Sequence, residues 1–124
     1  MELVIIIIIL GILAGLLLPS FKRIRERTMD KEAIAGLQLI YNAERVYMEK
    51  HQTPYPPSWI VTNLSWINGN LSLDLISKNW QFNIGSNSYS YQAQAARTSG
   101  PCIGRVWSIN ASNDTPSCLG ACCP

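Results

Sequence analysis

The hydrophobic pattern divides the chain into an apolar run, a periodic segment and a mixed remainder. Residues 3–18 carry no charged or polar side chain, and they lie directly between Glu2 and Pro19. As a helix they span about 24 Å at ~1.5 Å per residue, slightly less than the ~30 Å hydrocarbon core of a bilayer. Because such a helix is apolar on every side, it has no solvent face. We expect either lipid or copies of the same helix to surround it.

Two other interpretations of the apolar run depend on its flanks. A secretory signal peptide has basic residues before a shorter apolar core and a small-residue cleavage site after it. Here an acid comes first and the basic residues follow, at Lys22, Arg23, Arg25 and Arg27. This order argues against a signal peptide. A plain membrane anchor with the same basic cluster would have its C-terminal side in the cytoplasm.

Residues 22–52 are predicted to form the amphipathic half of the same helix. Apolar and aromatic positions recur at helical spacing: Ile24, Ile34, Leu37, Ile40, Tyr41, Tyr47 and Met48. Charges of alternating sign between them predict a solvated face: Glu26, Arg27, Asp30, Lys31, Glu32, Glu44, Arg45, Glu49 and Lys50. The helix is expected to stop before the proline-rich segment 53–57, because proline cannot propagate it.

Residues 53–124 are predicted to form a globular, β-rich head. Alternating apolar and polar residues indicate strands at 80–84, 88–95 and 105–110, with a turn at 85–87 and a short helix at 71–76. We therefore expect an α+β fold, with an antiparallel sheet of three or four strands laid on the upper half of the long helix. The predicted segments are the hydrophobic helix 1–21, the amphipathic half 22–52 and the head 53–124.

The first quarter of the chain contains three short motifs with a characteristic spacing. They are Glu2-Leu3-Val4-Ile5, Gly11-Ile12-Leu13-Ala14 and Leu18-Pro19-Ser20-Phe21. Together they resemble the N-terminal methylation motif of bacterial type IV pilins and type II secretion pseudopilins. The resemblance implies the type IV pilin fold, in which a long N-terminal helix packs on a small antiparallel sheet and a disulfide closes a C-terminal loop. It also implies assembly roles for Glu2, Gly11, Pro19 and Phe21.

The same resemblance implies a function as the structural subunit, a major pilin, of an extracellular type IV pilus for adhesion, twitching motility or DNA uptake. The expected partners are other copies in a helical homopolymer, the inner membrane before assembly, the pilus assembly machinery, and a surface or DNA ligand. Met1 stands where the family has the residue just before the glutamate. The mature N-terminus is therefore expected a few residues before Met1.

Two alternatives to a pilin stay open. The first is a pseudopilin of a type II secretion system. Major pseudopilins carry a Trp-Gly-x-Pro-Tyr segment and a calcium-binding loop without cysteines, and this chain departs from them in Trp80-Gln81-Phe82-Asn83 and in its cysteine-rich tail. The departure favours the pilus. The second alternative is a monomeric membrane-anchored binding domain.

Glu2 poses an energetic problem at the start of the apolar run. An ionised carboxylate in an apolar medium costs several kcal/mol unless it is paired, so it requires a cation or a proton. The resemblance implies that the cation is the N-terminal amine of a neighbouring subunit, which sets the axial register of each incoming helix. The alternative role, an acid favoured by the helix dipole, is worth only ~0.3–1 kcal/mol.

Gly11 and Pro19 both weaken a helix, and they bracket one short segment of the apolar run. Glycine costs ~1 kcal/mol relative to alanine inside a helix, and proline about 3 kcal/mol or more. Local melting between Ala14 and Pro19 in a filament is therefore expected. A simple proline kink, or close helix contact at Gly11 and Gly15, is the alternative.

The four cysteines, all in the last quarter, predict disulfides and an oxidising, extracytoplasmic compartment. We expect Cys102 to pair with one of the other three, together with a second local bridge; the cysteines are Cys102, Cys118, Cys122 and Cys123. A zinc site is the competing idea, but the spacing lacks paired Cys-x2-Cys and has no nearby histidine. Pilins commonly have two cysteines in this loop, so the second pair is a departure.

Other candidate chemistry is sparse. His51 is the only histidine, so no Ser/His/Asp triad or histidine-based metal site is expected, and we predict a non-enzyme without cofactor, metal or small-molecule substrate. The net charge of +2 is too small for a dedicated nucleic-acid module. DNA capture by a fibre would need only a few exposed cations repeated along the polymer, and Arg97 and Arg105 are the candidates.

Overall fold

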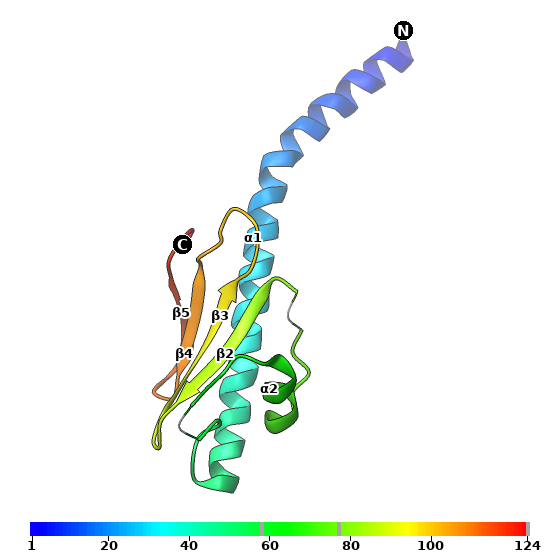
Figure 1. Cartoon of the computed structure of the whole chain (residues 1–124). Coiled ribbons are helices and arrows are strands. Elements are labelled where there is room, and N and C mark those ends of the chain that lie inside the picture. The colour runs from blue at the N-terminus through cyan, green and yellow to red at the C-terminus, as the bar shows by residue number, and fades with distance from the viewer. Residues whose placement is uncertain (58, 77, 124) are drawn as a thin grey trace. The chain divides into compact units, whose positions relative to one another are not determined.

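The computed structural model describes the backbone of residues 1–57, 59–76 and 78–123, and the side chains of these residues apart from 17–22. It divides into two compact units, Met1–Lys31 and Glu32–Pro124. Figure 1 shows the elements, which in chain order are α1 (Glu2–His51), β1 (Ile60–Val61), α2 (Leu64–Leu71), β2 (Trp80–Ser86), β3 (Tyr91–Arg97), β4 (Val106–Asn110) and β5 (Asn113–Leu119). The α+β class and the long N-terminal helix are confirmed.

Helix α1 ends where the sequence predicts. Its last residue is His51, and Gln52 takes a left-handed φ of 62° while its amide donates to the Met48 carbonyl oxygen at 2.8 Å. The proline-rich segment 53–57 follows, and prolines have no amide hydrogen to continue the helical ladder. The part of α1 from residue 32 onward belongs to the second unit.

The sheet is an antiparallel meander in the order β1-β2-β3-β4-β5 (Figure 1). It has more strands than the three or four predicted. Strand β1 has two residues, which is too short for a periodic signal. Strand β5 contains no buried residue, so it shows no apolar alternation, and its Pro116 is tolerated because the strand lies at an edge.

The first hairpin turn lies later than the predicted turn at 85–87. Gly85 and Ser86 are paired within β2, and the turn is closed by the Asn87 amide donating to the Ser90 carbonyl oxygen at 2.9 Å. Gly85 was interpreted as a turn residue from the sequence. In the structure it faces Ile60 of β1, and a Cβ added at Gly85 would lie 3.3 Å from the Ile60 side chain.

The short helix α2 precedes the segment 71–76 that was predicted to be helical. Asn63 caps its N-terminus by accepting hydrogen bonds from the amides of Ser65 and Trp66 at 2.9 and 3.4 Å. Ser72 then takes a left-handed φ of 55°, which ends the helix. The prediction was wrong because the capping asparagine was not recognised as a helix start.

The core of the second unit lies between α1 and the inner face of the sheet. Two rows of paired residues cross β2, β3 and β4 with alanine in the middle: Phe82, Ala95 and Trp107, then Ile84, Ala93 and Ile109. All six are buried, as are Ala33, Leu37 and Ile40 of α1. Small residues on the central strand leave room for the helix. At Gly36 an added Cβ would lie 2.6 Å from the Phe82 ring, so only glycine fits this approach without a shift.

Candidate assembly segment and disulfide-bonded tail

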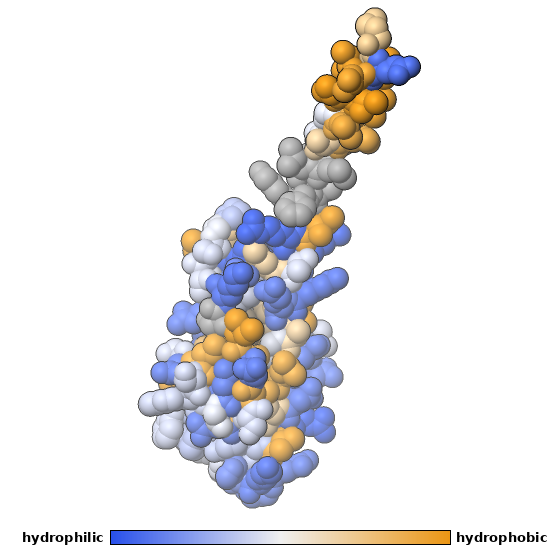
Figure 2. Space-filling view, turned by 90° about the vertical axis from the view of Figure 1, so that its right-hand side faces the viewer, coloured by the Kyte–Doolittle hydropathy of each residue, from blue (hydrophilic) through white to orange (hydrophobic). Residues whose placement is uncertain are grey.

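Residues 2–16 of α1, called the assembly segment below, expose apolar side chains all round the helix. Eleven large apolar residues between Leu3 and Leu16 are each 51–72% exposed. Figure 2 shows the apolar surface of this segment. Within the residues whose side chains the structure describes, no helix carries a stretch long and apolar enough to cross a membrane.

Two of the four predicted assembly residues lie in this segment. Glu2 is exposed in the first turn of α1. Apart from the neighbouring residues and backbone of the helix itself, no described atom lies within 4 Å of where a Cβ of Gly11 would be, and the same holds for Gly15, four residues further on. Nothing in the described part of the chain therefore requires glycine at either position. The side chains of the other two assembly residues, Pro19 and Phe21, lie outside the described residues.

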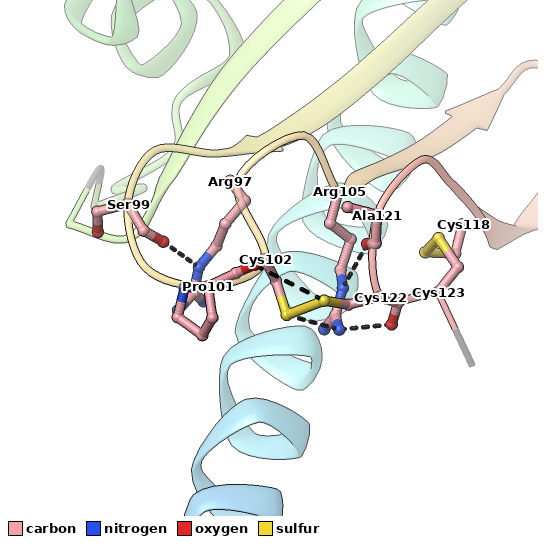
Figure 3. Close-up of a disulfide and its surroundings, with 9 residues drawn as sticks. All are labelled: Arg97, Ser99, Pro101, Cys102, Arg105, Cys118, Ala121, Cys122 and Cys123. Atoms are coloured by element: carbon pink, nitrogen blue, oxygen red, sulfur yellow. Dashed lines mark hydrogen bonds between the residues drawn. A yellow bond between two sulfur atoms is a disulfide. The ribbon is translucent and has the colours of Figure 1, made fainter.

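All four cysteines form disulfides in the second unit. Cys102 pairs with Cys122 across 20 residues, and Cys118 pairs with Cys123 across five. This is the arrangement of one longer and one local bridge that the sequence analysis expected. Figure 3 shows how the first disulfide joins the loop that carries Cys102 to the tail after β5.

Close backbone contact also holds this tail to the loop. Gly120 has a φ of +90°, and a Cβ added there would collide with the carbonyl oxygen of Gly104. Gly104 itself has a φ of +95°. Glycine at both positions therefore permits a left-handed backbone and a close approach of two chain segments.

Arg105 is a buried cation beside the first disulfide. It is 4% exposed, and its guanidinium donates to the Ala121 carbonyl oxygen (Nε, 3.3 Å), to the Cys122 carbonyl oxygen (Nη2) and to the Cys102 sulfur (Nη2, 3.4 Å), as drawn in Figure 3. The side chain thus fixes the tail by charge-assisted hydrogen bonds to its backbone. Sequence reasoning missed this role, and the only signal was the short spacing to Cys102.

Arg97 is buried as well, with 7% exposure. Its Nε donates to the Ser99 carbonyl oxygen at 2.9 Å, and its guanidinium carbon lies 5.4 Å from the centre of the Trp80 ring. From the sequence, Arg97 and Arg105 are candidates for exposed cations that contact DNA. That assignment is wrong, because both groups are buried and engaged within the head.

Glu44 is fully buried, although the charge pattern placed it on a solvated face. It is 0% exposed, and its Oε2 accepts a hydrogen bond from the Tyr55 amide at 3.0 Å, while its Oε1 has no hydrogen-bond partner among the described residues. The missed signal is helical spacing, since Glu44 follows Ile40 by four positions and Leu37 by seven. It therefore continues the apolar stripe that faces the sheet.

Burial determines the charge state of this site. Desolvation raises the pKa of Glu44 to about 7, against the smaller opposing effect of the Tyr55 amide. Tyr91 of β3 is 2% exposed, and no residue that the structure describes forms a hydrogen bond with its hydroxyl. Burial, and next the nearby Glu44 carboxyl, raise the pKa of Tyr91. The two groups thus form a polar site inside an apolar core.

A polar groove crosses the outer face of the sheet. Its volume is about 610 Å³, and the described residues that line it carry no charge; they include Asn83, Ser90, Gln92, Gln94, Asn110 and Ser112. Asn83, Gln92 and Gln94 alternate with the buried core positions of β2 and β3, so these three side chains point away from α1. The groove offers amide and hydroxyl groups to a neutral ligand.

In the described part of the chain, no group of three or more His, Cys, Asp or Glu side chains is placed to hold a metal ion. Searches of protein-family models, curated proteins and solved structures found no match to this chain.

Proposed function

We propose that this protein is the structural subunit of an extracellular filament of the type IV pilus kind, which polymerises through its N-terminal helix. The observation that carries the proposal is the assembly segment, a helix exposed and apolar on all sides with a carboxylate at its start. Such a surface needs an apolar environment. Copies of the same helix supply one, and the motif resemblance points to the same arrangement.

The hydrophobic effect favours association of the segment over its exposure to water. Burying one large aliphatic side chain is worth roughly 1.5–3 kcal/mol. Eleven such residues are at least half exposed, so burying this whole surface gives a gain of the same order as, or larger than, the ~4–15 kcal/mol cost of association.

Lipid alone removes this water contact too, so a second factor is needed to favour a fibre over the bilayer. Between helices in an apolar medium, close packing at small residues drives contact, and Gly11 and Gly15 lie one turn apart with open space around them. Glu2 is a further factor that favours the fibre. Its carboxylate is unfavourable in an apolar medium, and a cation of a neighbouring copy stabilises it there.

The head domain supports an extracytoplasmic location. Two disulfides join its C-terminal segments, and disulfides persist in oxidising compartments. In the proposed fibre the apolar segments form the core, and the heads face the solvent. Adhesion, twitching motility and DNA uptake are the activities proposed for such a fibre, and the polar groove on the sheet is a surface suited to neutral ligands.

The proposal is tested by shearing the cell surface of a producing strain and examining the sheared material. Negative-stain microscopy is expected to show fibres, and mass spectrometry is expected to find this polypeptide as their main component. Short fibres that stay inside the envelope would assign the protein to a secretion pseudopilin instead. Recovery of the chain only as a monomer in membranes would contradict polymerisation.

A further inference from the structure

The two cysteines of the Cys102–Cys122 disulfide differ in their exposure to solvent. Cys102 is 5% exposed, whereas Cys122 is exposed and has a left-handed φ of 59°. Thiol–disulfide exchange begins with attack of a thiolate on one of the two sulfurs, and access decides which sulfur is attacked. An external thiolate therefore reaches the Cys122 side of this bond more readily.

The two sulfurs of the same disulfide also differ in their electrostatic surroundings, because a cation lies beside only the Cys102 sulfur in the contacts described here. The buried guanidinium of Arg105 donates to the Cys102 sulfur at 3.4 Å. Arginine keeps its positive charge in proteins, and a neighbouring cation stabilises a thiolate. Since a more stable thiolate leaves faster, Cys102 is the better leaving group. Access and charge thus select the same direction of cleavage (Figure 3).

We propose that Cys122 is a thiol-exchange site for a low-molecular-weight thiol. The thiolate attacks the Cys122 sulfur, a mixed disulfide forms there, and Cys102 leaves as a thiolate held by Arg105. A second thiolate then attacks the sulfur that the first reagent contributed to the mixed disulfide, which releases Cys122 as a thiolate. The two reagent thiols become a disulfide, and their two electrons reduce the protein bond.

The consequence is a reversible release of the tail from the loop. Two further contacts of the tail do not involve the Cys102–Cys122 bond: the Cys118–Cys123 bridge, and the hydrogen bonds of Arg105 to the carbonyl groups of Ala121 and Cys122. The separated thiols therefore remain close to each other, which favours closure when the thiol is removed. This inference does not depend on filament assembly.

The first test needs no variant. The oxidised full chain in mild detergent is treated with limiting glutathione, acid-quenched and alkylated. Trypsin cleavage after Arg97 and Arg105 then places Cys102 alone on fragment 98–105, and the other three cysteines on 106–124. We expect an alkylated Cys102 fragment and a glutathione adduct on 106–124, which fragmentation assigns to Cys122. Glutathione on 98–105, or earlier opening of Cys118–Cys123, would overturn the proposal.

A second test removes the cation. Arg105→Gln keeps a hydrogen-bond donor without the charge, and it is expected to slow the first exchange about tenfold, while the exchange rate of Cys118–Cys123 stays unchanged. Arg105→Lys restores the charge and is expected to recover most of the rate. An unchanged exchange rate in a folded Arg105→Gln protein would refute the role of Arg105. If this variant does not fold, the site of glutathione attachment in the wild type still tests the proposal.

Discussion

Replacing Glu2 with alanine is expected to reduce the yield of assembled fibres at least tenfold without lowering the cellular amount of the subunit. In a bilayer, the carboxylate costs several kcal/mol until a cation of a neighbouring copy pairs with it. The alanine variant has no such cost, so it loses both a driving force for leaving the bilayer and the contact that sets its register. Yield is measured as the ratio of sheared to cell-associated polypeptide by immunoblot.

The matched control removes a carboxylate from an exposed position far along the same helix. Glu49→Ala changes the net charge by the same amount as Glu2→Ala, and Glu49 is exposed. This variant is expected to assemble normally. Undiminished fibres from Glu2→Ala would show that pairing of this carboxylate does not drive assembly.

The free energy of unfolding is expected to fall as pH rises through the titration of Glu44, because burial raises the pKa of this carboxyl. The pKa of Glu44 is raised from 4.5 to about 7 in the folded protein. Between these values the unfolded chain has released the proton while the folded chain retains it, so stability falls as pH rises. Below pH 4.5 the contribution is fully present, and by pH 7 about 3 kcal/mol has been lost.

Glu44→Gln isolates this effect because glutamine does not titrate. Its amide oxygen can accept the Tyr55 amide hydrogen, as the Glu44 carboxyl does. In urea denaturation of the full chain in detergent, the stability of the variant relative to wild type is expected to rise by about 3 kcal/mol from pH 4 to pH 8. A flat difference for Glu44→Gln would contradict the account, because it would mean that folding does not raise the pKa of Glu44.

The sequence predicts the elements that have a strong period or a strong breaker. The apolar run and the stripe through Leu37 and Ile40 predict α1, and the prolines after His51 predict its end. Alternation predicts β2, β3 and β4 within a few residues. Strand β5 was missed because an exposed edge strand has no apolar face to reveal it.

The buried polar residues were the least predictable part of the head. Glu44 and Arg105 resemble ordinary surface charges in a linear pattern, and each is buried by contacts with segments distant in the sequence. The cysteine spacing suggested one longer and one local bridge. Which of the adjacent residues Cys122 and Cys123 joins Cys102 depends on the conformation of the tail, which spacing alone does not specify.

Cryo-electron microscopy of the sheared fibres is the most direct test of packing through the assembly segment. The reconstruction is expected to show a core of α-helices in which residues 2–16 of each copy contact the same residues of neighbouring copies, with the disulfide-bonded heads outside. A cation of an adjacent copy should lie within hydrogen-bonding distance of Glu2. Fibres held together by the heads alone, with the apolar segments on the outside or absent from the density, would contradict the proposed assembly.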